Sequence, residues 1–370
     1  MRILVTGSDG FIGMNLREAL RERGGFGLLP VTRATSGPEL QAAVAEAEAV
    51  IHLAGANRPE DPAEFTRGNV GFTALLCDAL AALGRPVPVA FASSIQAGRD
   101  TPYGQTKRAA EERLALHAKR TGSPVAIYRL PNVFGKWCRP NYNSAVATFC
   151  HNIARGLPIQ VNDPAAEVQL VYVDTVVQEL IEFLKVPSEG LRFPGIAPVY
   201  RMSVGELAAQ IRAFRDVRQS LVTEPVGTGL VRALYSTYVS ELPAADFSYS
   251  IPVHSDPRGT FVEMLKTRDS GQFSYFTAHP GVTRGSHYHH SKTEKFLVIS
   301  GRARFRFRHL LTNELYELET RGGAPTIVET IPGWVHDITN IGEDELFVML
   351  WANEIFDPGR PDTFAARLEP

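Results

Sequence analysis

A short glycine-containing stretch near the start of the chain could bind a dinucleotide. An apolar run, residues 3–5, leads directly into Thr6-Gly7-Ser8-Asp9-Gly10-Phe11-Ile12-Gly13, which is typical of a strand, a tight turn and the start of a helix. Gly7 would allow the turn, Gly10 would let a pyrophosphate approach the backbone, and Gly13 would let the helix pack against the strand. Backbone N–H groups at the helix N-terminus would then face the bound anion. The residues predicted to contact a cofactor here are Gly7, Gly10, Phe11, Ile12 and Gly13; a plain strand-to-helix junction is the alternative interpretation.

Tyr103 and Lys107 form a second feature with chemical potential. They are four residues apart, so a helix places them on one face. Together with the Gly-x-x-Gly-x-x-Gly spacing, this pair resembles the extended short-chain dehydrogenase/reductases, which mostly act on nucleotide sugars. The resemblance implies that Tyr103 donates a proton to the alkoxide formed by hydride transfer, while Lys107 holds the nicotinamide ribose and lowers the phenol pKa. It also implies that Ser94 binds the substrate carbonyl, although only eight residues separate Ser94 from Tyr103, fewer than in most of the family.

Two further segments bear on the cofactor. Arg33 follows the second predicted strand, twenty residues after Gly13, where an acidic side chain usually binds a free ribose 2′-hydroxyl. An arginine there favours a 2′-phosphate, so we expect NADPH rather than NADH; a solvated surface arginine is the alternative. The segment Leu53-Ala54-Gly55 resembles the loop that closes over the adenine side of the cofactor.

The segment from 129 to 144 is dense in Arg, Lys, Asn and aromatic residues, which suit sugar hydroxyls, a nucleobase and a diphosphate. On composition alone it could equally be a polar surface loop. It is similar to one group within the family, the bifunctional UDP-sugar enzymes of the UDP-N-acetyl-L-fucosamine pathway, in which a reductase is joined to a C-terminal cupin. The resemblance extends over the whole chain and implies a UDP-linked 4-keto amino sugar as substrate, with predicted contacts from Asn132, Lys136, Arg139, Asn141 and Tyr142.

The C-terminal part carries a candidate metal site. Gly281-x5-His287-x-His289-x4-Glu294-x6-Gly301 fits the first cupin motif, and the Pro-Gly-Trp-Val-His segment ending at His336 resembles the second. In a strand, His287 and His289 would point to the same face, where Glu294 and His336 could complete a site of three histidines and one carboxylate. Such a set binds one divalent metal ion; zinc is our first choice, and nickel, manganese and iron fit as well. A barrel that has lost its metal, or histidines on a surface, are the alternatives.

The two sites together imply an order of reactions. A hydrogen next to a ketone is acidic because its carbanion delocalises as an enolate, which a Lewis acid stabilises. Reduction removes that acidity, so C3 epimerisation in the cupin must precede NADPH-dependent reduction at C4. The related enzymes convert UDP-2-acetamido-2,6-dideoxy-L-arabino-hexos-4-ulose to the L-talose sugar nucleotide, and we expect a role in capsule or O-antigen synthesis. The alternatives are a reductase whose cupin serves only as a dimerisation module, and a nucleotide-sugar sensor without turnover.

Composition limits the partners. The chain has 370 residues, 44% hydrophobic content and a formal net charge of −2, so it offers no basic field for nucleic acid or an anionic membrane. Its three cysteines form no CxxC motif, and no apolar run is long enough to span a bilayer. We therefore expect a cytoplasmic protein, and a homodimer on the analogy of cupins that pair.

The elements that position these residues fall into two patterns. Up to about residue 183, short apolar runs at 3–5, 28–32, 49–53, 87–92, 125–129 and 170–173 alternate with helix candidates, which predicts a Rossmann-type α/β fold with a doubly wound parallel sheet. A helix is expected from Ser203, with Glu206 as its capping-box partner, and a crossing segment over 234–246. The short runs after residue 247 predict an all-β cupin jelly-roll barrel. We expect a dehydrogenase/reductase domain over 1–243 and a cupin over 244–370.

Overall fold

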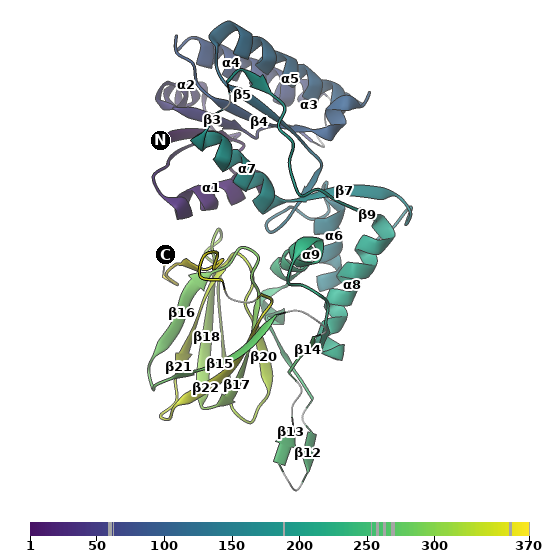
Figure 1. Cartoon of the computed structure of the whole chain (residues 1–370), viewed down its shortest axis with the longest axis vertical. Helices are drawn as coiled ribbons and strands as arrows, with labels where there is room; N and C mark the ends of the chain where they lie inside the picture. The colour runs from purple at the N-terminus through teal and green to yellow at the C-terminus, as the bar shows by residue number, and fades with distance from the viewer. Residues whose placement is uncertain are drawn as a thin grey trace. The chain divides into compact units, whose positions relative to one another are not determined.

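The computed structural model describes residues 1–57, 61, 63–187, 189–252, 254–256, 259–261, 264–267, 271–354 and 357–369. The chain forms two compact units. The first comprises Met1–Ser144 and Val168–Arg201, and the second comprises Ala145–Glu167 and Met202–Pro370. The second unit therefore packs three helices from before residue 243 together with the C-terminal strands (Figure 1). The expected domain boundary at 243/244 stays a prediction. Among the described residues, no helix has the length and apolar character to cross a membrane.

A six-stranded parallel sheet forms the centre of the first unit, which confirms the expected α/β fold class. The strand order is β2-β1-β3-β4-β5-β8, and every pairing is parallel. The central strands are buried on both faces, as parallel strands covered by helices must be. The strands are β1 (Arg2–Thr6), β2 (Gly27–Val31), β3 (Ala49–His52), β4 (Val89–Ser94), β5 (Val125–Leu130) and β8 (Leu191–Arg192).

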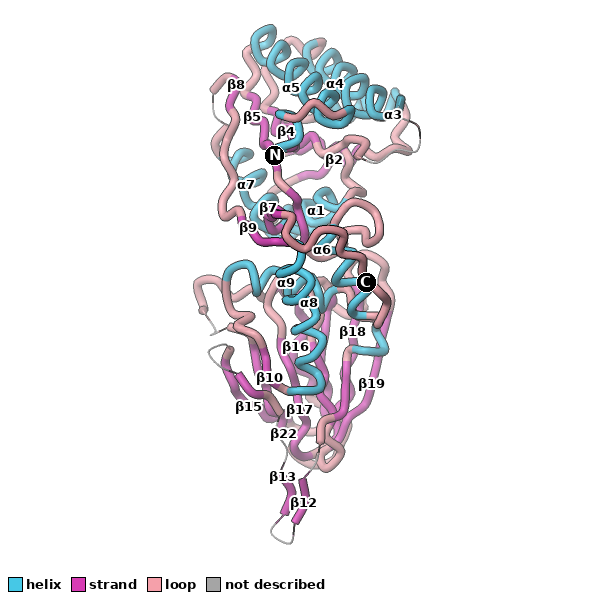
Figure 2. Tube along the Cα trace, turned by 90° about the vertical axis from the view of Figure 1, so that its right-hand side faces the viewer, coloured by secondary structure: helices cyan, strands magenta, loops and turns pink. Residues whose placement is uncertain are grey.

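Helices cover both faces of this sheet. Figure 2 shows α4 and α5 on one side of the strands and α1 and α7 on the other. The longer helices are α1 (Phe11–Arg23), α2 (Gly37–Glu46), α4 (Phe72–Ala81), α5 (Pro102–Thr121) and α7 (Val173–Lys185). Three short elements, α3 (Ala63–Phe65), the π-helix η1 (Thr66–Gly71) and the 3-10 helix η2 (Ile95–Gly98), lie in the connections before α4 and α5.

One expected strand lies in a different sheet. The apolar run at 170–173 belongs to β7 (Glu167–Tyr172), which forms a three-stranded sheet with β6 (Asn132–Phe134) and β9 (Tyr200–Ser203). The sixth strand of the main sheet is instead the two-residue β8. A strand this short, in a Pro- and Gly-rich segment, has too few residues to show an apolar period.

Three helices of the second unit pack on one another: α6 (Ala145–Ala154), α8 (Val204–Ser220) and α9 (Gly229–Ser240). The predicted capping box is present, because Ser203 accepts the Glu206 N–H while the Glu206 carboxylate accepts the Ser203 N–H. The crossing segment expected over 234–246 was wrong for its first half, which is helical. All residues from Ala233 to Val239 are buried, including Ser236 and Thr237. A helix buried on every side has no polar face, so its period is hidden in the sequence.

The C-terminal strands form two antiparallel five-stranded sheets, which confirms the all-β class and which we call the β domain. One sheet has the order β11-β20-β17-β22-β15 and the other β19-β18-β21-β16-β23. The first contains β11 (Ser248–Ser250), β20 (Thr326–Glu329), β17 (Glu294–Ser300), β22 (Leu346–Ala352) and β15 (Gln272–Ala278). The second contains β19 (Leu315–Arg321), β18 (Arg302–His309), β21 (Trp334–Asn340), β16 (Thr283–Tyr288) and β23 (Phe364–Ala365). Two small pairings accompany them: the hairpin of β12 (His254–Asp256) and β13 (Gly259–Phe261), and β14 (Lys266–Thr267) with β10 (Val222–Thr223).

Candidate active sites

The glycine turn has a shape that only glycine allows at two positions. Gly7 has φ +65°, and a Cβ there would lie 2.9 Å from the Ala54 nitrogen. A Cβ at Gly13 would lie 2.3 Å from the Gly7 oxygen. Because α1 begins at Phe11 with Gly10 as its N-cap, no side chain of the cap occupies the first-turn N–H groups. This turn can therefore present N–H groups to an anion.

The loop after β3 lies beside this turn. Thr6 Oγ1 accepts the N–H groups of Leu53 and Ala54, both at 3.1 Å. A Cβ at Gly55 would lie 3.3 Å from Lys107 Nζ, so the lysine head is next to this loop. The glycine turn, the Leu53–Gly55 loop and Lys107 thus meet at the carboxyl edge of the parallel strands, where α/β folds bind ligands.

The predicted catalytic trio is brought together at the same edge. Thr101 caps α5 by accepting the Gly104 N–H at 3.1 Å, which places Tyr103 and Lys107 in successive turns. Ser94 lies close enough to Tyr103 for its hydroxyl to lower the pKa of the phenol. The short connection between Ser94 and Tyr103 therefore does not separate them, because η2 folds it into a compact turn.

The electrostatics of the trio differ from expectation in one respect. Burial raises the pKa of Tyr103, and the Ser94 hydroxyl offsets this only in part. Burial lowers the pKa of Lys107 to about 8, while the Glu111 carboxylate acts in the opposite direction. The expected lowering of the phenol pKa is not found, since desolvation outweighs it. Lys107 Nζ donates to the Ala92 carbonyl oxygen at 2.9 Å.

Two buried polar residues near the trio were missed by sequence reasoning. Asn69, on η1, accepts the Ala56 N–H at 2.8 Å and donates to Thr106 Oγ1 at 3.1 Å. Nothing in the sequence around Asn69 signals this role. Glu111 accepts from Ser93 Oγ at 2.5 Å and from both the Nε and the Nη2 of Arg129, at distances from 2.6 to 3.2 Å. Its position four residues after Lys107 was the available signal.

The structure does not gather the remaining cofactor and substrate candidates into one cluster. Arg33 follows β2 with its side chain 83% exposed, 3.6 Å from a Glu64 oxygen. Asn132 is exposed and donates to the Gln169 carbonyl at 3.0 Å. The exposed Arg139 guanidinium lies 5.1 Å from the centre of the half-buried Tyr142 ring, and Asn141 is exposed with φ +53°.

Lys136 differs from the other substrate candidates in its burial. Its side chain is fully buried, and its Nζ lies 3.1 Å from Asp174 Oδ1 at the start of α7. In this arrangement the ammonium is paired with Asp174, and the contact of Lys136 with the substrate stays a prediction.

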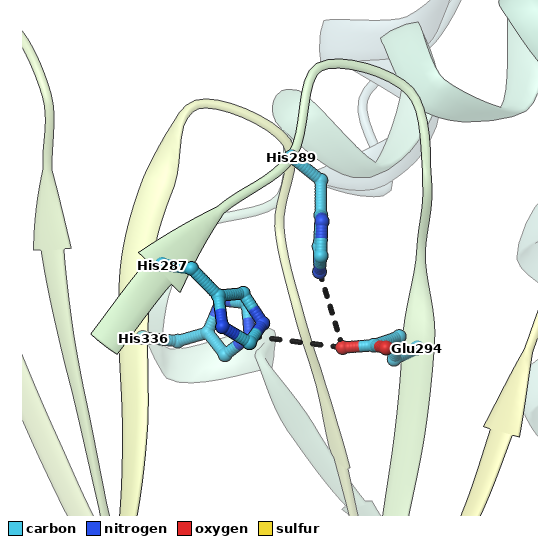
Figure 3. A group of neighbouring side chains, drawn as sticks. All are labelled: His287, His289, Glu294 and His336. Atoms are coloured by element: carbon cyan, nitrogen blue, oxygen red, sulfur yellow. Dashed lines mark hydrogen bonds and ion pairs between the residues drawn. The ribbon is translucent and has the colours of Figure 1, made fainter. Parts of the chain in front are cut away.

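The four predicted metal ligands come together in the β domain. Their ligating atoms all lie within 4.8 Å of one another (Figure 3). His287 and His336 face each other across β16 and β21, whereas Glu294 begins β17 in the opposite sheet. A bulge at Gly285 and Ser286, with φ of +96° and +59°, turns β16 just before His287. The cluster therefore lies between the two sheets.

His289 reaches the cluster by a route that strand alternation did not predict. It lies one residue beyond β16, in the loop before β17, and descends from that loop toward Glu294. Its Nε2 is 3.2 Å from Glu294 Oε2, and its Nδ1 is 2.6 Å from the carbonyl oxygen of Asp362. Asp362 was not predicted from the sequence.

The donor set fits a cation. Burial lowers the pKa of His336 and, to about 3, that of His287, so both rings are neutral at pH 7 and can offer lone pairs. The His336 nitrogens make no hydrogen bond within the described part of the chain. His289 Nδ1 faces a carbonyl, which can only accept, so its Nε2 in the neutral ring offers a lone pair toward a carboxylate. Lone pairs converging on one point are favourable when a cation lies between them.

Comparisons with known proteins identify relatives of both parts of the chain. The model of the NAD dependent epimerase/dehydratase family matches residues 3–193, and that of the polysaccharide biosynthesis C-terminal domain matches residues 254–364. The chain is 58% identical over 365 residues to the UDP-2-acetamido-2,6-beta-L-arabino-hexul-4-ose reductase of Pseudomonas aeruginosa, covering 99% of this chain and 98% of that protein. It is also similar to the capsular polysaccharide assembling protein CapF from Staphylococcus aureus, with 39% identity, a TM-score of 0.68, and coverage of 99% of this chain and 100% of that one. The Bacillus subtilis spore coat polysaccharide biosynthesis protein SpsL is 27% identical over 119 residues, which cover 30% of this chain and 79% of that protein.

Proposed function

This chain belongs to the NAD dependent epimerase/dehydratase family, and we propose that it is a bifunctional nucleotide-sugar enzyme. In this proposal the first unit reduces the C4 ketone of a UDP-linked 2-acetamido-2,6-dideoxy sugar with NADPH, and the β domain first inverts C3. The product is the UDP-linked L-talose sugar, for capsule or O-antigen synthesis. The name of the full-length Pseudomonas relative supports the ketone reduction and the substrate class.

The observation that carries the reductase half is that Ser94 and Tyr103 lie close together, with Lys107 beside the loop after β3. Bound NADPH would supply the hydride to C4. Ser94 binds the carbonyl oxygen, and Tyr103 gives its phenolic proton to that oxygen as the C–O double bond becomes an alcohol. Because burial raises the pKa of Tyr103, the phenol remains protonated and ready to donate at neutral pH. Lys107, charged below a pH of about 8, holds the ribose.

The buried cluster of three histidines and one carboxylate carries the epimerase half. His287, His289, Glu294 and His336 would hold a divalent ion, which would act as a Lewis acid toward the negative charge that develops when the C3 proton leaves. The surrounding strands keep bulk water from the cluster, since three of the four residues are buried. Epimerisation must precede reduction, because the alcohol at C4 no longer acidifies C3.

A second candidate function is reduction alone, with the β domain serving in assembly. The printed name of the Pseudomonas relative mentions only a reductase, which favours this candidate. The two functions differ in one measurable event, the exchange of the C3 proton with solvent.

The test uses the full chain with Tyr103→Phe, which prevents reduction from consuming the ketone. This variant is incubated with the 4-keto sugar in deuterated water, and deuterium at C3 is followed by NMR. We expect exchange in this variant and a loss of at least 100-fold when Glu294→Gln is added. No exchange in the variant with the intact cluster would leave reduction alone as the function.

Glu317→Gln is the matched control. This carboxylate on β19 is more than half exposed, and its contact with Arg304 is long, at 4.0 Å. It should leave the exchange unchanged. Reduction itself is measured as NADPH oxidation by the wild type, which Tyr103→Phe should lower by roughly 100-fold or more. A Tyr103→Phe enzyme that oxidises NADPH at the wild-type rate would contradict the reductase half.

We further infer a cytoplasmic homodimer. The three cysteines Cys77, Cys138 and Cys150 are buried and form no disulfide with one another, which suits a reducing compartment. The dimer rests on analogy with cupins that pair, and light scattering of the purified chain measures it.

A further inference from the structure

The C-terminal segment fastens the loop that carries His289. The carboxylate of Asp362 accepts three consecutive N–H groups: its Oδ1 that of His290 at 3.0 Å, and its Oδ2 those of Ser291 at 2.9 Å and Lys292 at 2.7 Å. The Ser291 hydroxyl donates to Oδ2 as well, at 3.0 Å. Asp362 itself has φ +39°, a backbone conformation uncommon for residues other than glycine. One side chain therefore fixes the turn between His289 and Glu294.

The backbone of the same residue reaches His289. Its carbonyl oxygen lies 2.6 Å from His289 Nδ1, so the proton of a neutral ring is assigned to Nδ1 and the lone pair to Nε2. The lone pair then points to the side of Glu294 Oε2, 3.2 Å away. His289 lies one residue outside β16, where its backbone carbonyl accepts the Gly333 N–H at 3.0 Å, and the Asp362 carbonyl contacts its ring.

Helix α9, in the same unit, contacts Asp362 through Arg232. Arg232, in the first turns of α9, contacts Glu354 at 2.7 Å, Ser291 Oγ at 2.7 Å and Asp362 Oδ2 at 3.6 Å. These groups are largely buried, since Asp362 and Glu354 expose 16% and 15% of their side chains. The contacts of Arg232 and Asp362 thus link α9, the C-terminal segment and the loop after β16.

We propose that Asp362 is a positioning residue that fixes the tautomer and the orientation of His289 as a metal ligand. This inference rests on the proposed metal site and adds to it a residue 73 positions away from its target. The side chain holds the loop and the backbone carbonyl contacts the ring, so removing the carboxylate releases the loop from the residue whose carbonyl orients the ring. Outer partners of this kind typically contribute 10–100-fold to metal affinity.

The experiment compares full-length wild type, Asp362→Ala and Asp362→Asn in zinc binding, measured by competition with a chromophoric chelator. We expect zinc affinity to fall about 10–100-fold in Asp362→Ala. Asp362→Asn keeps one acceptor oxygen for the loop, so its affinity should fall less. Asp357→Ala is the control, because Asp357 is half exposed and its side-chain contacts, within the described part of the chain, are to Gly359 and Arg360 in its own turn.

A spectroscopic readout distinguishes positioning from a general loss of stability. With Co²⁺ in place of zinc, the visible absorption bands report the ligand geometry, and we expect them to change in Asp362→Ala and to be partly restored in Asp362→Asn. NADPH binding by the first unit should be unchanged in every variant. Zinc affinity within twofold of wild type, with the same Co²⁺ spectrum, would overturn the role of Asp362.

A different outcome would count against the metal site itself. Wild type that binds no zinc, or that binds it equally after Glu294→Gln, would refute the proposed cluster and this inference with it. If Asp362→Ala does not fold, the comparison of Asp362→Asn with Asp357→Ala decides the question by the same two measurements.

Discussion

A buried charge network joins the helices of the second unit to the β domain, and its disruption should be costly. Glu329, at the end of β20, accepts from Lys295 on β17 and from Arg218 on α8, the latter at 2.5 Å. Lys295 and Glu329 expose only 1% and 5% of their side chains. Tyr235 on α9 lies 3.4 Å from the same carboxylate. Glu329→Gln would therefore leave two cations facing a neutral amide.

The size of the effect follows from burial. Removing one partner of a buried ion pair costs about 3–5 kcal/mol, because the other charge stays desolvated. Lys295 keeps the Tyr249 hydroxyl at 3.2 Å and Arg218 is 18% exposed, so we place Glu329→Gln at the lower end, about 3 kcal/mol. In a folding unit of about 150–250 residues, this lowers the melting temperature by roughly 6–12 °C.

The loss of stability in Glu329→Gln should be measured at neutral pH. Burial alone would raise the pKa of Glu329, but Lys295 and Arg218 hold it below its usual value, so its contribution is lost as pH falls through that lowered pKa. Burial alone would lower the pKa of Lys295, but Glu329 holds it above its usual value, so its contribution is lost only in strong alkali. At pH 7 both contributions are therefore complete.

Scanning calorimetry of the full chain checks this reasoning, with Glu319→Gln as the control. The Arg302–Glu319 pair has a 3.2 Å contact but exposes 61% and 55% of its side chains, so its loss should cost no more than about 1 kcal/mol. Adding Lys295→Met to Glu329→Gln removes the stranded ammonium and should recover part of the stability. Equal melting temperatures for Glu329→Gln and Glu319→Gln would refute the argument.

Three further predictions concern the two sites. Arg33→Ala should weaken NADPH binding roughly 10–100-fold, through the loss of a charge-assisted hydrogen bond, and leave NADH binding unchanged; equal effects on both cofactors in calorimetric titrations would contradict NADPH preference. Reductase activity should fall as the pH rises through about 8, where Lys107 loses its proton. Glu111→Gln should move this fall to lower pH, because the Glu111 carboxylate raises the pKa of Lys107, whereas the exposed Glu112→Gln should not. A pH–rate profile that does not move in Glu111→Gln would exclude this role of Glu111. Chelation should lower the melting temperature of the second unit, because zinc at about 1,000 times its Kd adds about 4 kcal/mol of stability; a melting temperature insensitive to zinc would count against the cluster.

The sequence predicted those parts of the molecule whose signals are local. Strands β1 to β5 lie within two residues of the predicted runs, because parallel strands covered by helices are short, nearly continuous apolar segments; β2, at the edge of the sheet, is partly exposed. The capping box at Ser203 and Glu206 was found because both partners are three residues apart. The resemblance to extended reductases joined to a second domain is confirmed by the family match and the full-length relatives.

What the sequence hid depends on packing. Helix α9 has no polar face because it is surrounded by protein, so its residues 233–239 gave no period. Lys136 was predicted to contact the substrate because it lies in a polar, aromatic-rich segment, yet it is buried and its ammonium pairs with Asp174, 38 residues later. Burial of this kind depends on how the whole chain folds, so the sequence around the residue does not indicate it.

The candidate metal cluster shows both cases within one site. The match to the cupin motifs predicted His287, His289, Glu294 and His336 as ligands, and the structure places their ligating atoms within 4.8 Å of one another. The stated reason was right for His287, which lies in a strand, and wrong for His289, which lies in a loop. A histidine in a loop can serve as a ligand only if something outside its own strand fixes the ring, and here the carbonyl of Asp362 is in hydrogen-bonding contact with it. The identity of a ligand can therefore be predicted from a motif, but the rigidity that makes it a good ligand depends on a distant segment.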